Sequence, residues 1–411
     1  MISTTARQID AVWRIEGARI VATLAKHTGD LGLAEDLAQV ALVEALEQWP
    51  AAGVPRNPGA WLTAVAKRRA IDQWRRRAAL DERYRAMAHD LSEAAEDAWE
   101  PIDDDVLRLV FTACHPVLSR ESQVALTLRA VGGLSTQEIA RMLLVPVPTV
   151  QARITRAKKT LAAAHVPFEA PEPSQWRERL GGVLGVVYLI FTEGYAATSG
   201  DRWMREDLAH EALRLGRILS GLVPREPEAH ALVALMELQA SRFAARIDAD
   251  GAPVLLADQD RARWDWAQIR RGRDALARAD ASGRARGAYA LQAAIAEQHA
   301  VAASVEATDW DEIVVLYEAL GRIAPSPVVE LNRAVAVAMA TGPATALRIV
   351  DRLEQEGALG GSHLLPSVRG ELLARLGRTE EARSELRLAA GLAANEREAA
   401  VLRGKAAALE G

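Results

Sequence analysis

Two short stretches carry the side chains that could bind or react with a polar ligand. They are "FTEGY" (191–195) and "ADQDRARWDW" (257–266), which combine carboxylates, arginines and aromatic rings. Such groups, gathered in a cleft, could line a pocket for a polar molecule. The candidate ligand cluster comprises Glu193, Tyr195, Asp258, Asp260, Arg261 and Trp264.

The same cluster has a purely structural interpretation, which we favour. Ion pairs between neighbouring helices are common in helical arrays, and Trp264, Trp266 and Trp310 would then be packing residues. Catalysis has still less support, because the histidines form no HExxH pair and the chain has no glycine-rich phosphate loop or G-x-S-x-G elbow. The sequence therefore predicts neither an enzyme nor a metal or cofactor site.

Two basic stretches indicate a different chemistry, the neutralisation of phosphates. "VAKRRAIDQWRRR" (65–77) carries six basic residues and one acid, and "QARITRAKKT" (151–160) carries four bases and no acid. Residues 81–105, between them, hold ten acids and only two arginines. A basic helix alone is as consistent with a solvated face as with nucleic-acid binding. The pattern as a whole predicts two small positive modules on an acidic tether.

The second basic stretch belongs to a predicted helix-turn-helix, "LSTQEIARMLLVPVPTVQARITRAKKTLA" (134–162). Ser135 and Glu138 can form a capping box that begins a short helix. Proline fixes φ and lacks a backbone N–H, so Pro146 and Pro148 predict a tight turn and the start of a second helix. The buried stripe of that helix is predicted to be Val150, Ile154, Ala157 and Leu161. An ordinary helical hairpin is the alternative interpretation.

Composition places these elements in an α-helical chain. Its 411 residues suffice for two or three domains, and its bias towards Ala, Leu, Arg and Glu favours helix over sheet. The single cysteine, Cys114, excludes an internal disulfide and suits a reducing compartment. Because the chain shows no apolar leader and no stretch of membrane-spanning length, the sequence predicts a soluble cytoplasmic protein. The net charge is −5, so any attraction to nucleic acid must be local.

Three segments, in this order, resemble bacterial sigma factors of the extracytoplasmic-function group. They are "AEDLAQVALVEALEQW", "PGAWLTAVAKRRAIDQWRRR" and "LSTQEIARMLLVPVPTVQARITRAKKTL". In that family the first domain binds core RNA polymerase and melts the −10 promoter element, and the second reads the −35 element. The resemblance implies sigma region 2 over residues 8–80, an acidic linker over 81–105 and region 4 over 106–165.

The resemblance also implies three sets of contact residues. The polymerase-binding set, predicted on the exposed face of the helix 33–49, is Glu35, Asp36, Gln39 and Glu44. The −10 set, on a loop and the helix after it, is Arg56, Asn57, Trp61, Lys67, Arg68, Asp72, Arg75 and Arg76. The −35 set is Ser135, Thr149, Gln151, Arg153, Arg156, Lys158 and Lys159. Departures from the family pattern at Val40, Arg68, Pro148 and Gln151 bear on the promoter sequence rather than on the class.

Residues 175–411 resemble the long C-terminal extension of one sigma-factor subgroup, in segments such as "TDWDEIVVLYEAL" and "SPVVELNRAVAVA". The extension in that subgroup is built of tetratricopeptide-like helical hairpins, which implies a helical-repeat domain that regulates the sigma modules. The stretch 372–398 has the small residues that such repeats use where helices approach closely. A regulatory protein or ligand is a candidate partner there. The alternative from another class is a signal-sensing or scaffold protein whose repeat domain binds a ligand or peptide.

Overall fold

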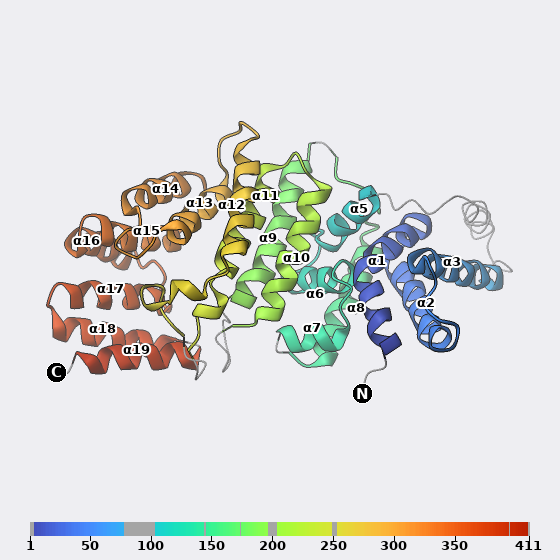
Figure 1. The fold of residues 1–411 in the computed structure, drawn as a ribbon, viewed down its shortest axis with the longest axis horizontal. Helices are drawn as coiled ribbons and strands as arrows, with labels where there is room; N and C mark the ends of the chain where they lie inside the picture. Colours follow the sequence, from blue (N-terminus) through green and yellow to red (C-terminus); the bar gives the residue numbers. More distant parts are fainter. Residues whose placement is uncertain are drawn as a thin grey trace. The chain divides into compact units, whose positions relative to one another are not determined.

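The computed structural model of the chain consists of α-helices joined by loops, which confirms the all-α prediction (Figure 1). It describes residues 4–77, 103–143, 145–172, 174–195, 204–248, 253–393 and 395–409. Most of the predicted acidic tether, up to residue 102, lies outside the described residues. The chain divides into two compact units, Met1–Val187 and Tyr188–Gly411. No helix within the described ranges is both long enough and apolar enough to cross a membrane.

The first unit begins with three helices that share one core: α1 (Thr4–Thr28), α2 (Leu31–Ala52) and α3 (Pro58–Arg77). Asp30 begins α2, because its carboxylate accepts hydrogen bonds from the Gly32 and Leu33 backbone N–H groups at 2.7 and 3.1 Å. Large side chains from all three helices, among them Leu24, Trp49 and Leu62, are fully buried. Burial of these apolar faces, rather than helix propensity alone, holds the bundle together.

Among the described residues, four further helices precede α9 (Trp176–Tyr195) in this unit: α5 (Asp103–Ala113), α6 (Arg120–Ala130), α7 (Thr136–Leu143) and α8 (Val147–Ala163). The predicted capping box is present, since Glu138 N donates to Ser135 Oγ at 3.2 Å and Ser135 N donates to the Glu138 carboxylate at 2.8 Å. Pro148 lies in the first turn of α8, and the predicted stripe of that helix is buried. Sequence and structure therefore agree on a short helix, a proline turn and a second helix.

Helix α9 (Trp176–Tyr195) contains the boundary between the two units. Its first residues pack in the first unit, where the Trp176 ring lies 5.1 Å from the ring of Phe111. Arg179 Nη2 also donates to the Phe111 carbonyl at 3.1 Å, near the C-terminal end of α5. The start of α9 therefore belongs with the helix-turn-helix side of the chain, although the sequence placed a separate domain from residue 175 onwards.

The second unit is a succession of helices, each packed chiefly on its neighbours in sequence (Figure 1). They are α10 (Glu206–Leu222), α11 (Pro227–Ala240), α12 (Trp266–Asp280), α13 (Ala288–Val301), α14 (Trp310–Ile323), α15 (Pro327–Ala340), α16 (Pro343–Gln355), α17 (Leu364–Arg375), α18 (Thr379–Leu392) and α19 (Glu396–Ala408). Short 3₁₀ turns lie at Phe243–Ala245, Leu256–Asp258 and Arg261–Arg263.

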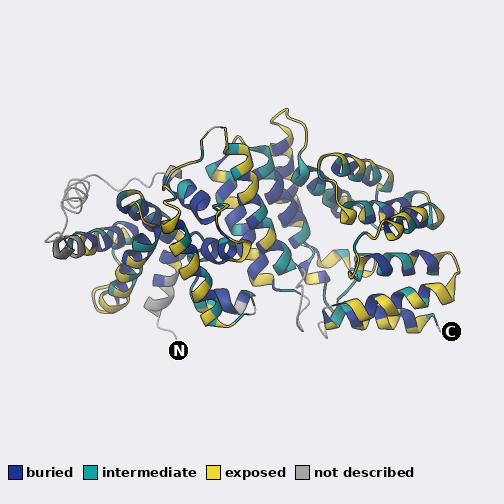
Figure 2. Ribbon diagram, turned by 180° about the vertical axis from the view of Figure 1, so that it is seen from behind, coloured by how far each residue is buried: buried dark blue, intermediate teal, exposed yellow. Residues whose placement is uncertain are grey.

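Two glycines outside the stretch 372–398 allow neighbouring helices to approach closely. A Cβ on Gly194 would lie 2.4 Å from the Ala209 backbone nitrogen of α10, and one on Gly370 would lie 2.9 Å from Leu386 of α18. Buried residues lie where helices face one another, and exposed residues lie on the outer surface (Figure 2). The arrangement is one of paired helices, and each pair buries its apolar face against the next.

Candidate functional site

Helix α8 presents a polar and basic face opposite its buried stripe. Gln151, Arg156 and Lys159 are exposed, while Thr149 and Arg153 are half-buried. No side chain caps the helix N-terminus at Pro146, and the Thr149 backbone N–H donates to the Pro146 carbonyl at 2.9 Å. This face has the composition and position that a recognition helix needs for base edges and phosphates.

Two other residues of the predicted −35 set have partners within the protein. The Ser135 hydroxyl is engaged in the capping box of α7. Lys158 Nζ lies 3.0 Å from Glu35 Oε2 and 3.3 Å from Asp36 Oδ1, and so faces α2. The −35 set stays a prediction, and its exposed members are Gln151, Arg156 and Lys159, with Thr149 and Arg153 half-buried beside them.

The loop and helix predicted to contact the −10 element lie together in the structure. Asn57 Oδ1 accepts a hydrogen bond from Ala60 N at 3.1 Å and so caps α3. The Trp61 ring packs edge-on against buried Trp49 with centroids 5.3 Å apart, which closes the bundle at this point. Arg56 and Arg68 are exposed and Lys67 is half-buried. The side chains of Asp72, Arg75 and Arg76 lie outside the described part of α3.

The predicted exposure of the polymerase-binding set is wrong for Glu35. This residue is only 4% exposed, because Arg129 and Lys158 cover its carboxylate. Glu44 is turned towards α3, where its Oε1 accepts from Arg69 Nε at 2.5 Å. Asp36 is exposed and Gln39 is half-buried.

An apolar stripe accompanies this acidic face on α2. Val40, Val43 and Leu46 are 41%, 52% and 46% exposed. Exposed apolar side chains beside acidic ones are typical of a surface that packs against another protein. This exposed stripe was not predicted, although its spacing of three residues is visible in the sequence.

The candidate ligand cluster of the second unit divides into separate structural contacts. Glu193 pairs with buried Arg205. Asp260 caps a 3₁₀ turn through Ala262 N, at 2.9 Å, and Asp258 is exposed. These contacts accord with the structural interpretation of the cluster.

The remaining members, Tyr195, Arg261 and Trp264, lie in or beside a group of partly buried cations. Arg242 Nη2 donates to the Tyr195 hydroxyl at 2.8 Å, and the Arg246 guanidinium lies 3.5 Å above the Tyr195 ring. Burial lowers the pKa of Arg246 to about 10. Arg261 lies 4.4 Å from the centre of the Trp264 ring and donates to the carbonyls of His299 and Ala302. Trp264 is 3% exposed, as predicted for a packing residue, whereas Trp266 is exposed.

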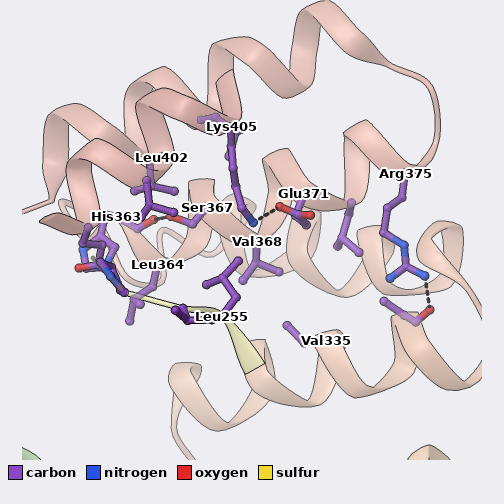
Figure 3. A pocket seen from close by; sticks show the side chains of 17 residues that line it. Leu255, Val335, His363, Leu364, Ser367, Val368, Glu371, Arg375, Leu402 and Lys405 are labelled. Carbon is purple, nitrogen blue, oxygen red and sulfur yellow. Dashed lines mark hydrogen bonds and ion pairs between the residues drawn. The ribbon is translucent and has the colours of Figure 1, made fainter. Parts of the chain in front are cut away.

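A cavity of about 420 Å³ lies elsewhere in the second unit, among α15, α17 and α19 (Figure 3). Val335, Val368 and Leu402 project towards it from these helices, and Leu255 approaches from the segment before α12. Its charged residues are mostly paired at the edge, with Lys405 Nζ 2.7 Å from Glu371 Oε2 and His363 Nε2 3.1 Å from Glu398 Oε1. The cavity is therefore apolar inside and polar at its rim, and local sequence patterns gave no sign of it.

Comparisons with known proteins assign the first unit to a class. Residues 14–79 match sigma-70 region 2, and residues 108–161 match sigma-70 region 4. Residues 179–280 match a family of unknown function (DUF6596). The chain thus carries the domains of a sigma-70 factor, a class without enzymatic activity, followed by a C-terminal domain of unassigned role.

Two kinds of relative extend this assignment. The chain belongs to the same family as a Rhizobium meliloti (strain 1021) protein named "Uncharacterized protein R00370", with 45% identity over 390 residues that cover 92% of this chain and 90% of that protein. It is also similar to the "Probable ECF RNA polymerase sigma factor SigI" of Mycobacterium tuberculosis, strains CDC 1551 / Oshkosh and H37Rv. The two sequences are 27% identical over 175 residues, which cover 41% of this chain and 59% of the relative. No solved structure matches the chain.

Proposed function

We propose that this protein is a sigma factor of the extracytoplasmic-function type. It binds core RNA polymerase through the acidic and apolar face of α2, recognises the −35 element through α8 and the −10 element through the loop before α3, and promotes melting there. The observation that carries the proposal is the basic face of α8, held by a capped short helix and a proline turn within a matched region 4 domain. The C-terminal helical domain regulates this activity.

A transcription assay with purified components tests the proposal. Core RNA polymerase with the full-length protein should give promoter-dependent transcripts from a genomic library, and polymerase alone should not. The double variant Arg153→Ala, Arg156→Ala is the matched control, since loss of two base-reading contacts of about 1–3 kcal/mol each should abolish promoter selectivity. If the wild-type protein gives no transcripts beyond those of core polymerase, the proposal is wrong.

The apolar cavity favours a second role, in which the C-terminal domain binds a small apolar ligand. A cavity of about 420 Å³ falls within the range of about 300–1,000 Å³ typical of ligand pockets. Octanoate serves as the probe, because its chain is apolar and its carboxylate can remain at the polar rim. It should raise the melting temperature of the wild-type protein and leave that of Leu402→Asp unchanged.

Leu388→Asp is the matched control for this experiment. Leu388 lies on α18, is 54% exposed and does not line the cavity, so its substitution should leave the octanoate effect intact. An equal response in Leu402→Asp and wild type would refute binding in the cavity.

A further inference from the structure

The buried carboxylate of Glu35 joins the two sigma modules of the first unit. Its Oε1 accepts a hydrogen bond from Arg129 Nε of α6 at 2.6 Å. Its Oε2 lies 3.0 Å from Lys158 Nζ of α8, an ion pair whose angle falls short of a hydrogen bond. A carboxylate this deeply buried must be paired, because an isolated buried charge is very costly. We call Glu35, Arg129 and Lys158 the clasp.

Further contacts between the same two modules lie along α1. Lys26 Nζ of α1 is 3.3 Å from Asp105 Oδ2 of α5, and Asp105 is buried. Gly133, in the loop before α7, has a φ of 72°, and a Cβ there would lie 3.5 Å from the ring of Trp13. Contacts at three places along α1 and α2 make the clasp part of a defined docked arrangement.

The clasp occupies the Glu35 end of the surface that the proposed function assigns to polymerase, whereas the apolar stripe of Val40, Val43 and Leu46 stays exposed. Glu35 stands within the polymerase-binding segment, and Lys158 also contacts the neighbouring Asp36 at 3.3 Å. The basic face of α8 is affected differently, since Arg156 and Lys159 remain exposed. The docked arrangement therefore covers an acidic part of α2 and leaves the DNA-reading face accessible.

Resting on that proposed function, we propose that the clasp is autoinhibitory: region 4 covers the Glu35 side of α2 in the free protein, and polymerase binding requires the clasp to open. The attraction within a buried ion pair roughly equals the free-energy cost of removing its charges from water. A partner that offers its own cations to α2 can therefore replace Arg129 and Lys158. Opening also frees region 4 to reach a −35 element a few helical turns from the −10 element.

An engineered disulfide tests the proposal, because it locks the clasp reversibly. A Cβ on Gly32 would lie 3.9 Å from the Lys158 Cβ, within the range of about 3.5–4.5 Å for disulfides. The full-length variant Gly32→Cys, Lys158→Cys should form this bond on mild oxidation. The oxidised protein should bind bacterial core RNA polymerase at least tenfold more weakly than the same protein after reduction. It should still bind a −35 duplex, as its reduced form does.

Matched controls separate the effect of the locked clasp on polymerase binding from the effects of the substitutions themselves. The single variants Gly32→Cys and Lys158→Cys cannot form the bond and should bind polymerase equally with and without oxidant. Arg129→Gln, which weakens the clasp by removing one of the two cations that hold Glu35 and leaves α2 and α8 unchanged, should bind polymerase about threefold or more tighter than wild type. Failure of the disulfide to form, or equal polymerase binding by its oxidised and reduced forms, would overturn the proposal.

The two proposals fail in distinguishable ways. If neither wild type nor any reduced variant binds polymerase, then the proposed function itself is wrong and the autoinhibitory role is lost with it. If wild type binds but locking has no effect, the sigma-factor function stands and only autoinhibition is refuted.

Discussion

His299 in α13 gives a direct test of the packing around the cationic group of the second unit. Its ring lies edge-on to Trp310 with centroids 5.2 Å apart. Burial, together with the nearby positive charges of Arg242 and Arg261, lowers the pKa of His299 from 6.5 to about 4. The unfolded chain therefore takes up a proton near pH 6.5, whereas the folded protein does so only near pH 4.

The sign and size of the effect follow from this difference. Between pH 6.5 and 4 the unfolded state binds more protons, so His299 lowers the free energy of unfolding as the pH falls. The shift corresponds to a loss of about 1.4 kcal/mol at pH 5.5 and about 2.5 kcal/mol at pH 4.5, relative to pH 8. His299→Phe cannot titrate and keeps a ring against Trp310, so it should not suffer this loss.

Urea unfolding monitored by tryptophan fluorescence measures the difference at pH 8, 5.5 and 4.5. Other titrating groups act on both proteins and cancel when wild type is compared with His299→Phe at each pH. The variant should gain about 2.5 kcal/mol relative to wild type between pH 8 and pH 4.5. A difference that does not change with pH would show that His299 is not held in a buried, cation-flanked site.

Three further predictions concern single contacts. Arg153→Ala should weaken the free energy of binding to a −35 duplex by about 1–3 kcal/mol and relax specificity at one base position. Lys159→Ala should weaken binding to all sequences alike and reduce the slope of log affinity against log salt concentration by about 1. Fluorescence anisotropy measures both. Gly194→Ala should destabilise the second unit by about 1–3 kcal/mol in thermal unfolding, because the new Cβ would meet the backbone of Ala209, and a neutral result would contradict that close approach. Burial raises the pKa of Cys114 to about 11, so its thiol should react slowly with a disulfide reagent at pH 8, whereas the urea-unfolded chain should react at least about tenfold faster.

Local signals predicted the helix-turn-helix well. The capping box at Ser135 and Glu138, the prolines and the apolar stripe of α8 all act over a few residues, so the sequence alone was sufficient to place them. The same reasoning placed Lys158 in the −35 set, whereas its side chain faces α2. On a helix of 3.6 residues per turn, Lys158 lies between the buried stripe and the exposed face, and only the docked α2 decides its partner.

The features that the sequence did not predict depend on contacts between residues that lie far apart in the chain. Glu35 and Arg129 are 94 residues apart, and neither has a neighbour in sequence that predicts the contact. An acidic side chain on a predicted helix is normally solvated, so the burial of Glu35 was unexpected. The cavity has the same origin, since Leu255, Val335 and Leu402 come together only when the paired helices stack. Asp260 of the ligand cluster caps a 3₁₀ turn, a role that depends on where the turn begins.

The position of the unit boundary changes how regulation by the C-terminal domain must be tested. A deletion from residue 175 would remove Trp176 and Arg179, expose the ring of Phe111 and leave its carbonyl without this partner. Loss of transcription activity in such a protein could then result from disruption of α5 rather than from the absence of a regulatory domain. Substitutions within the second unit avoid this problem, because the contacts of α5 and α8 stay intact. If Leu402→Asp alters transcript yield while −35 binding stays unchanged, the effect originates in the C-terminal domain, whereas an unchanged yield would show that the cavity takes no part in regulation.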